Sequence, residues 1–245
     1  MKVGPLVVQV AMAGEARPFL QRGDFRRLLA EGSEEAFGFE IYEGRAEGGH
    51  PVIVAVAGLD PRFGVDSIGT IPAALLTQRL IDRFAPRLLL NAGTAGGFER
   101  QGGRIGDVYL GDEAAVFHDR RIPLDGFRAM GAGHYPLHAS KALAEALSLR
   151  VGIVSTGDSL DCSVEDHAQL SALSASVKDM EAAAIAYVCE RRGVPLLLVK
   201  AITDIVDHEA ETAAQFLQNY GMAVARLADA LVAIVARLSL PEESG

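Results

Sequence analysis

The sequence predicts an α/β protein with a mostly parallel sheet that is covered by helices on both faces. Strand-like apolar runs alternate along the chain with segments of helical periodicity, which is typical of βαβ units. Two of the runs, Leu88–Leu90 and Leu196–Ile202, are apolar without alternation, as expected of strands buried on both faces. The 245 residues are 49% hydrophobic and contain no linker-like stretch, so we expect a single domain over residues 1–245.

Apolar and periodic segments define the elements of the first half of the chain. The run Leu6–Met12 is expected to form the opening strand and to pass into a helix. The runs Phe37–Tyr42 and Val52–Ala57 flank a polar, glycine-containing stretch, which predicts a hairpin. Apolar residues recur at helical spacing over Ile71–Phe84, and Pro86 ends this helix before the next strand.

The second half of the chain continues the alternation. Val108–Leu110 and Ala114–Phe117 are expected to be short strands, and Ser140–Leu147 a helix. Gly152–Ser155 predicts another strand, and the chain closes with an amphipathic helix from Ala213 to about Leu238. Ligands of parallel sheets bind at the carboxyl ends of the strands, and the unusual polar residues of this sequence cluster at those predicted ends.

The composition argues against several classes of partner and ligand. The formal net charge of −9 disfavours nucleic acid, whose binders concentrate Lys and Arg on one face. Cys162 and Cys189 are far apart and outside any CxxC pattern, so neither disulfides nor a metal site is expected. No apolar run approaches the roughly 20 residues of a membrane-spanning helix, and we expect no membrane partner.

The segment Ala11-Met12-Ala13 is similar to the small-residue pattern at which signal peptides are cleaved. However, Pro5 and Gln9 interrupt the apolar stretch before it, and cleavage would remove the predicted opening strand. We therefore expect a core strand here and a cytoplasmic protein.

An acid stands at the start of an apolar, helix-like run. From Met180 to Cys189 the sequence is apolar on nearly every side, which predicts a helix packed all round by protein, with Glu181 in its first turn. Burying an unpaired carboxylate costs several kcal/mol. Glu181 is therefore expected either to be paired and capped as a structural residue or to be held ready for a polar ligand.

Other candidate site residues lie at predicted strand ends. Glu15 follows the first strand at a helix start, where an acid can bind a ligand or simply stabilise the helix. The glycine-rich turn Asn91–Gly97 allows close approach of a ligand, and its Thr94 offers a hydroxyl, but it matches neither GxGxxG nor a P-loop. Asp204 follows a buried strand, where it could act on a ligand or cap the next turn.

Three separated acids, Glu15, Glu181 and Asp204, would suit cleavage of a sugar–base bond if they met in one pocket. That reaction passes through an oxocarbenium-like state and needs an acid for the leaving group and a base for water. His118-Asp119, by contrast, is interpreted as a hydrogen-bonded loop, because no paired-His ligand motif accompanies it. Lys200 lies within a predicted strand and is a candidate for burial with an acid.

Six motifs, in order along nearly the whole chain, resemble those of the methylthioadenosine/S-adenosylhomocysteine nucleosidases of the nucleoside phosphorylase superfamily, and especially their plant-type branch. The motifs are Val10–Ala16, Asn91–Phe98, Phe117–Pro123, Ser155–Asp161, Lys178–Ala184 and Ala201–Asp207. The resemblance implies a three-layer α/β/α sandwich with a mixed, mostly parallel sheet, a homodimer, and hydrolysis of 5′-methylthioadenosine to adenine and methylthioribose. It implies no cofactor and no metal.

The resemblance also implies roles for individual residues. Asp204 protonates N7 of adenine, and Glu15 holds and deprotonates the water that attacks C1′. Glu181 binds the ribose hydroxyls, and Met180 packs beneath the sugar. Thr94 keeps a hydroxyl near the reacting centre, where the family often has a serine.

Leu160 departs from the more widespread bacterial pattern, which has an aromatic residue that stacks on adenine. Asp161 follows it, where that pattern has an apolar residue. The plant-type branch shares Ser-Leu-Asp, so we expect an effect on base affinity and on tolerance of the 5′ substituent, with S-adenosylhomocysteine handled poorly.

Three alternatives remain open at this point. A purine nucleoside phosphorylase of the same superfamily needs basic residues to hold phosphate; here Glu15 would repel phosphate, and Arg62 is the one nearby candidate. Futalosine hydrolysis is another reaction within the same fold. A non-catalytic nucleoside-binding protein is the third alternative, and the presence of all three acids disfavours it.

Overall fold

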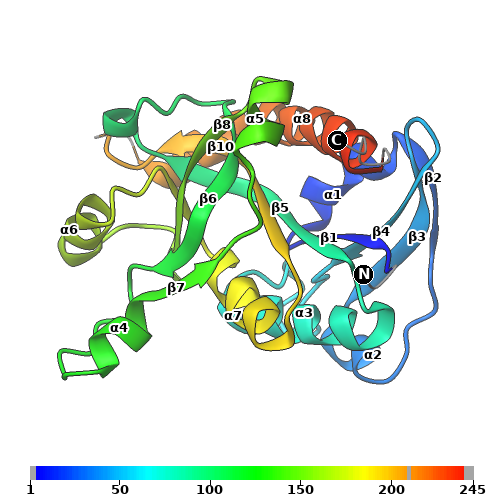
Figure 1. Cartoon of the computed structure of the whole chain (residues 1–245), viewed down its shortest axis with the longest axis horizontal. Helices are drawn as coiled ribbons and strands as arrows, with labels where there is room; N and C mark the ends of the chain where they lie inside the picture. Colours follow the sequence, from blue (N-terminus) through cyan, green and yellow to red (C-terminus); the bar gives the residue numbers. More distant parts are fainter. Residues whose placement is uncertain (1–3, 209–210, 240–245) are drawn as a thin grey trace, which may run out of the picture.

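The computed structural model describes residues 4–208 and 211–239 of the chain. Strands and helices alternate along most of these residues (Figure 1). In chain order they are β1 (Leu6–Val10), α1 (Ala13–Leu20), β2 (Gly23–Arg27), α2 (Ser33–Phe37), β3 (Glu40–Ala46), β4 (His50–Val56), α3 (Thr70–Phe84), β5 (Leu88–Gly97), the 3₁₀ turn η1 (Glu99–Gln101), β6 (Val108–Phe117), α4 (Phe127–Ala132), β7 (Gly133–Pro136), α5 (Lys141–Leu147), β8 (Arg150–Thr156), α6 (Val164–Ala172), β9 (Val177–Asp179), α7 (Ala182–Arg192), β10 (Leu196–Ile205) and α8 (Thr212–Ser239).

One mixed sheet runs through the described residues, with the strand order β10-β6-β8-β9-β5-β1-β4-β3-β2. At its centre, β1 pairs in parallel with β4 and β5, and β5 pairs in parallel with β10. At one edge, β2, β3 and β4 form an antiparallel meander. Because β10 pairs with β5 as well as with β6, the strands β5, β10, β6, β8 and β9 close into a small barrel.

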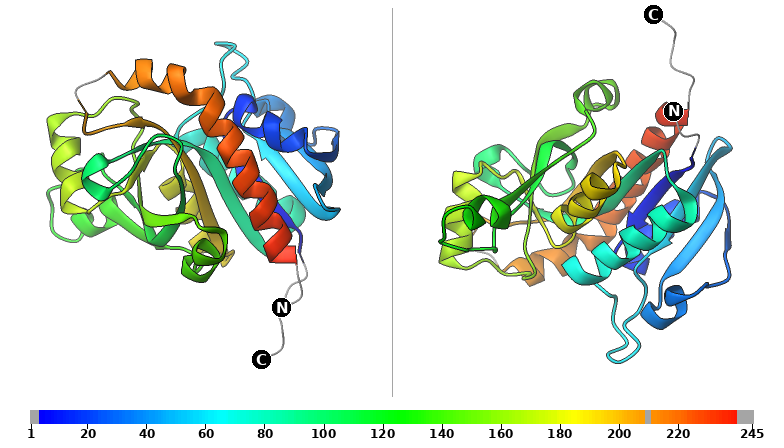
Figure 2. Two further views of the ribbon diagram at one scale, coloured as in Figure 1. Left: turned by 90° about the horizontal axis from the view of Figure 1, so that it is seen from above. Right: turned by 60° about the horizontal axis from the view of Figure 1, so that its bottom comes forward.

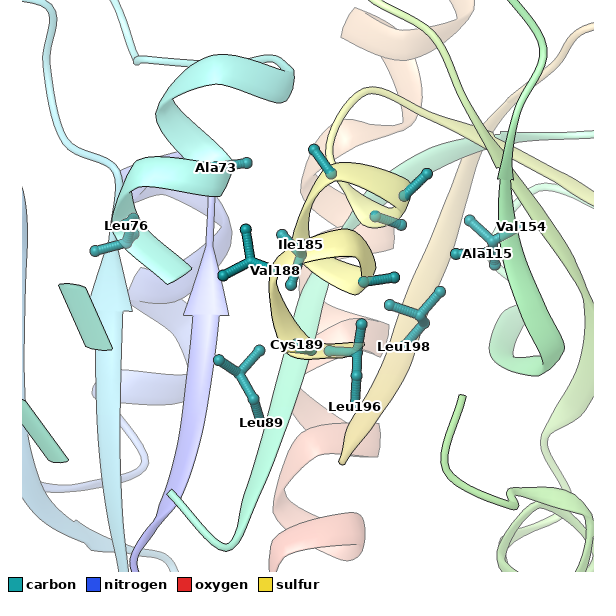
Figure 3. Packing of buried hydrophobic residues seen from close by; sticks show 14 of the residues in the cluster. Ala73, Leu76, Leu89, Ala115, Val154, Ile185, Val188, Cys189, Leu196 and Leu198 are labelled. Atoms are coloured by element: carbon teal, nitrogen blue, oxygen red, sulfur yellow. The ribbon is translucent and has the colours of Figure 1, made fainter. Parts of the chain in front are cut away.

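Helices cover both faces of this sheet. α1 and α8 lie on one face, where Phe19 packs in one buried cluster with Leu227 and Leu231. α3 and α7 lie side by side on the other face (Figure 2), where Leu76 and Ile185 belong to a second cluster (Figure 3). The three-layer α/β/α arrangement expected from the sequence is therefore confirmed. None of the helices in the described ranges is both long and apolar enough to cross a membrane.

The glycine-rich segment Asn91–Gly97 is predicted to be a turn. In the structure it is instead the C-terminal part of β5. A Cβ on Gly96 would lie 2.5 Å from the side chain of Val206 and 2.8 Å from Oδ2 of Asp204. A Cβ on Gly93 would lie 3.3 Å from Oε1 of Glu15. The glycines therefore allow two acidic residues to approach the backbone of a regular strand.

Several predicted bounds also differ from the structure. Glu181, expected in the first turn of a helix, precedes α7 as its N-cap residue. Asp204, expected beyond the end of a strand, lies within β10. The two short strands predicted around residues 108–117 are one strand, β6, interrupted by a shift in register between Gly111 and Ala115. The predicted hairpin is present as the antiparallel pair β3 and β4.

Candidate active site

A cavity of about 190 Å³ opens at the carboxyl ends of β1, β5 and β10. The structure brings all six sequence-predicted site residues together in its wall: Glu15, Thr94, Leu160, Met180, Glu181 and Asp204. Residues outside the predicted set also line the cavity, among them Ile68, Lys178, Asp179, Thr203, Val206 and Phe216. The place of the cavity follows from the fold, because central parallel strands deliver their ends to one edge of the sheet.

Glu15 lies in the first turn of α1 and is buried. Its Oε1 accepts hydrogen bonds from the amide and the hydroxyl of Thr94, both at 2.6 Å, and its Oε2 accepts the Met12 amide at 3.2 Å. Burial raises the pKa of Glu15, although the bonds from Thr94 and Met12 oppose this shift. Glu15 is therefore held in one orientation and can exchange a proton closer to neutral pH than an ordinary carboxyl can.

Glu181 ends the loop that leads into α7, and its Oε1 accepts the amide of Gly69 at 2.9 Å. Burial raises the pKa of Glu181, and the like charge of Asp179 raises it further. Met180 precedes it in the cavity wall. The carboxylate is fixed by a backbone donor from another element, which leaves its second oxygen available to a ligand.

Asp204 owes its direction to an irregularity of β10. The pairing of β10 with β5 shifts register between Ile202 and Asp204, so Thr203 is an extra residue and both Thr203 and Asp204 reach the cavity. The Thr203 hydroxyl donates to Oδ1 of Asp204 at 2.7 Å. Burial raises the pKa of Asp204 more than this bond and the charge of Lys178 lower it, so the protonated form persists to a higher pH than in an ordinary aspartic acid.

Lys200, which the sequence predicts to be buried with an acid, forms an ion pair with Asp179. Their charged atoms are 2.7 Å apart, and both side chains are almost fully buried. Asp179 also accepts the Thr156 hydroxyl at 2.6 Å and the Ala182 amide at 2.9 Å. Although Glu181 occupies the N-cap position of α7, the side-chain hydrogen bond that caps this helix comes from Asp179. Although burial opposes it, the charges of Asp179 and Glu181 raise the pKa of Lys200, which stays a cation.

The loop after β8 is connected to α3, far away in the sequence. Asp158 accepts the amide of Thr70 at 2.7 Å and its hydroxyl at 2.6 Å, which caps the start of α3. Asp158 is not among the predicted site residues, and its one local signal is an acid shortly after the predicted strand Gly152–Ser155. Through Gly69 and Thr70, the start of α3 contacts both Glu181 and the loop that carries Leu160.

His118 is buried, and its Nδ1 lies 3.1 Å from the Ser155 hydroxyl, as its interpretation as a structural loop residue requires. It does not line the cavity, and neither does Arg62, whose guanidinium lies over the ring of Phe63. Among the residues that the structure describes, no group of three or more His, Cys, Asp or Glu side chains could hold a metal ion.

A family model described as the phosphorylase superfamily matches residues 5–236. The chain belongs to this superfamily. It is 38% identical over 225 residues to a 5′-methylthioadenosine nucleosidase of Arabidopsis thaliana, covering 92% of this chain and 84% of that protein. It is 39% identical over 236 residues to a 5′-methylthioadenosine/S-adenosylhomocysteine nucleosidase of the same plant, covering 95% of this chain and 91% of the relative.

Solved structures give the same relationship. The apo structure of the Arabidopsis thaliana 5′-methylthioadenosine nucleosidase has a TM-score of 0.93 at 35% identity, covering 99% of this chain and 98% of that one. A futalosine hydrolase of Helicobacter pylori is less similar, with a TM-score of 0.78 at 25% identity, covering 96% of this chain and 98% of that one. The resemblance of this chain to the plant-type nucleosidases is therefore confirmed.

Proposed function

We propose that the protein hydrolyses the N-glycosidic bond of 5′-methylthioadenosine and releases adenine and methylthioribose. The observation that carries the proposal is one cavity lined by two buried carboxyl groups with raised pKa values, Glu15 of α1 and Asp204 of β10. Both plant relatives are nucleosidases of this substrate, which disfavours the phosphorylase, futalosine hydrolase and non-catalytic alternatives.

The two acids divide the chemistry between leaving group and nucleophile. Asp204 donates a proton to N7 of adenine, so that the base leaves as a neutral molecule while the C1′–N9 bond breaks. Glu15, ionised, accepts a proton from the water that attacks C1′ of the oxocarbenium-like sugar. The hydrogen bonds from Thr94 fix the direction of the Glu15 carboxylate and oppose the rise in its pKa that burial causes.

The other cavity residues bind the substrate in this proposal. Glu181 accepts hydrogen bonds from the ribose hydroxyls, and Met180 packs beneath the sugar. Leu160, 46% exposed at the cavity wall, covers the base. The lining includes apolar side chains that suit a methylthio group, such as Ile68 and Phe216.

The nucleophile distinguishes this proposal from a phosphorylase. Both described lysines at the site are engaged, because Lys200 pairs with Asp179 and Lys178 donates to two backbone carbonyls. A phosphate dianion would therefore meet the Glu15 carboxylate without a free cation to balance it. We expect purified protein to release adenine from methylthioadenosine at the same rate with and without phosphate. A steep rise with phosphate, accompanied by a ribose 1-phosphate, would replace the hydrolase by a phosphorylase.

We further propose a homodimer in which the partner subunit helps to close the 5′ end of the cavity. Large apolar side chains are exposed beside the cavity residue Ile68 and on the 118–132 segment: Phe63, Ile71, Leu75, Leu124, Phe127 and Met130. Such exposure is typical of an interface. A monomeric mass by light scattering, with full activity at the same concentration, would contradict this proposal.

We also propose that the chain forms a single domain and that the protein is cytoplasmic. Residues from both halves of the chain line the cavity, which supports a single domain. Cys162 and Cys189 are both free thiols, which supports a cytoplasmic, reducing environment.

A further inference from the structure

Lys178 is a buried cation in the cavity wall with an unusual set of partners. It lies on β9 opposite Gly96 of β5, and it is 5% exposed. Its Nζ donates to the carbonyl oxygen of Ser159 at 2.6 Å and to that of Leu160 at 3.0 Å. A buried ammonium needs hydrogen-bond acceptors such as these, because leaving its N–H groups without partners is costly.

The partners of Lys178 differ from those of the other buried lysine. Lys200 forms an ion pair with Asp179, whereas within the described part of the chain Lys178 forms no ion pair and is satisfied by the two carbonyl groups. Burial lowers the pKa of Lys178, and the nearby carboxyl groups of Asp204, Asp179 and Asp161 oppose the shift. The position thus retains a costly cation whose ammonium, among the described residues, donates hydrogen bonds to one loop.

That loop carries Leu160 into the cavity wall. Its other anchor is Asp158, which caps α3 and whose amide donates to Oδ2 of Asp119 at 2.9 Å. Asp158 fixes the start of the loop, and Lys178 holds the two residues that follow. Without the ammonium, the carbonyl groups of Ser159 and Leu160 would lose their shared donor, and Leu160 would be free to move away from the cavity.

We propose that Lys178 is a positioning residue, which holds the Ser159–Leu160 backbone so that the Leu160 side chain covers the base end of the bound nucleoside. This inference rests on the proposed function, because it assigns the base end of the substrate to Leu160. Lys178 acts chiefly through the loop, because its ammonium donates to the carbonyl groups of Ser159 and Leu160 and, among the described residues, to neither catalytic carboxyl group. Its loss should therefore weaken substrate binding much more than it slows bond cleavage.

The first test compares Lys178→Met, which keeps the aliphatic stem, with Lys178→Arg, which keeps a cationic donor. We expect Lys178→Met to raise KM for methylthioadenosine about 10-fold, as the loss of a shared buried donor predicts. We expect kcat to change by less than about 3-fold, and Lys178→Arg to recover part of the KM. Lys141→Met, at an exposed lysine of α5, is the matched control and should change neither parameter.

A double-mutant cycle decides whether Lys178 acts through Leu160. If it does, Leu160→Ala already loses most of what the lysine provides, and adding Lys178→Met should raise KM by little more. Effects on KM that multiply independently in the double variant would overturn the proposal, as would an unchanged KM in Lys178→Met. If Lys178→Met does not fold, Lys178→Gln takes its place in the cycle.

Hydrogen exchange separates failure of this inference from failure of the proposed function. In the protein without substrate, amides of residues 157–162 should exchange faster in Lys178→Met than in the unmodified protein, and Lys178→Arg should restore protection. Exchange that does not change would overturn the positioning role even if adenine is released normally. If the unmodified protein releases no adenine, the proposed function fails, and the exchange result alone still decides whether Lys178 holds the loop.

Discussion

The ammonium of Lys200 lies 2.7 Å from a carboxylate oxygen of Asp179, and the two side chains form a nearly fully buried ion pair beside the cavity. Three strands depend on this contact, because Asp179 also accepts the hydroxyl of Thr156 at the end of β8. Burial raises the pKa of Glu15 and of Glu181, and the charge of Lys200 opposes both shifts. One cation therefore both joins the barrel strands and limits the rise in the pKa of two cavity acids.

We expect Lys200→Met to be strongly destabilising. The substitution leaves the carboxylate of Asp179 buried without its counter-ion, and breaking a buried pair in this way costs about 3–5 kcal/mol. Urea unfolding followed by circular dichroism measures the change. Lys141→Met removes an exposed lysine that pairs with Asp112, and should cost less than about 1 kcal/mol. Equal losses in the two variants would show that the Lys200 pair contributes little.

A second buried carboxylate makes stability depend on acid pH. Glu34 accepts Arg79 Nε at 2.8 Å, Arg83 Nη1 at 2.6 Å and the Glu31 amide at 2.9 Å. Burial alone would raise the pKa of Glu34, but these hydrogen bonds lower it below the ordinary value of 4.5. The stabilisation is therefore fully present above the ordinary pKa and is lost as pH falls through the lowered one.

Glu34→Gln should accordingly reduce the free energy of unfolding at pH 7 by about 1–3 kcal/mol. It should also make the stability of the protein less sensitive to pH between about 5 and 3, because one titrating group is removed. Denaturant unfolding at a series of pH values compares the two curves. If the curves of the variant and the unmodified protein run parallel over this range, Glu34 is not a source of the pH dependence.

Much of the fold and the site could be predicted because the relevant signals are local in the sequence. Apolar runs predict the buried strands. The helical periodicity over Ile71–Phe84 predicts a helix whose bounds agree with those of α3 to within one residue. Glu15 and Asp204 are acids at or near strand ends, and parallel strands bring such ends together whatever their separation along the chain. The convergence on one cavity therefore required only the correct fold class.

Other features have no local signal. β9 is a strand of three residues that reads as the start of the following helix, so Lys178 and Asp179 could not be assigned to a sheet. The cap that Asp158 provides for α3 depends on two segments 88 residues apart. The bulge at Thr203 depends on the pairing of β10 with β5. These contacts are set by tertiary packing, which single-sequence periodicity does not report.

Glu15→Gln should bind substrate but hydrolyse it very slowly. The amide keeps the size of the carboxylate and can still accept from Thr94, but it cannot take a proton from water. We expect kcat to fall by about 10²–10⁴, as for loss of a general base. Calorimetry with methylthioadenosine and the inactive variant measures binding. The matched control, Glu35→Gln, changes an exposed acid and should leave kcat unaltered; near-normal turnover by Glu15→Gln would remove Glu15 from the mechanism.

Asp204 should give the reaction a basic limit. Because burial raises its pKa, the protonated and active form persists above the ordinary range of an aspartic acid and is lost as pH rises through the raised value. The profile of kcat/KM against pH should therefore fall on its alkaline side. Asp204→Asn should lower kcat by about 10²–10⁴ and abolish this alkaline fall, since no proton remains to be lost. A variant with the same alkaline limb would assign that limb to another group.

The substrate preference is expected to follow from the lining of the cavity. Methylthioadenosine and S-adenosylhomocysteine share the adenosine part, so in the proposed function the contacts with Asp204, Glu181 and Leu160 are common to both. The amino acid tail of the second substrate is a zwitterion, and its charged groups would lose water beside apolar lining residues such as Ile68, Val206 and Phe216. Leu160 also lacks the base–aromatic stacking that is worth about 1–3 kcal/mol, so less binding energy remains to offset an unfavourable tail.

We expect a higher kcat/KM for methylthioadenosine, measured by adenine release from each nucleoside under the same conditions. Leu160→Phe should raise kcat/KM for both substrates by a similar factor, because stacking acts on the shared base. Equal kcat/KM values for the two nucleosides in the unmodified protein would show that the tail does not enter the apolar part of the cavity.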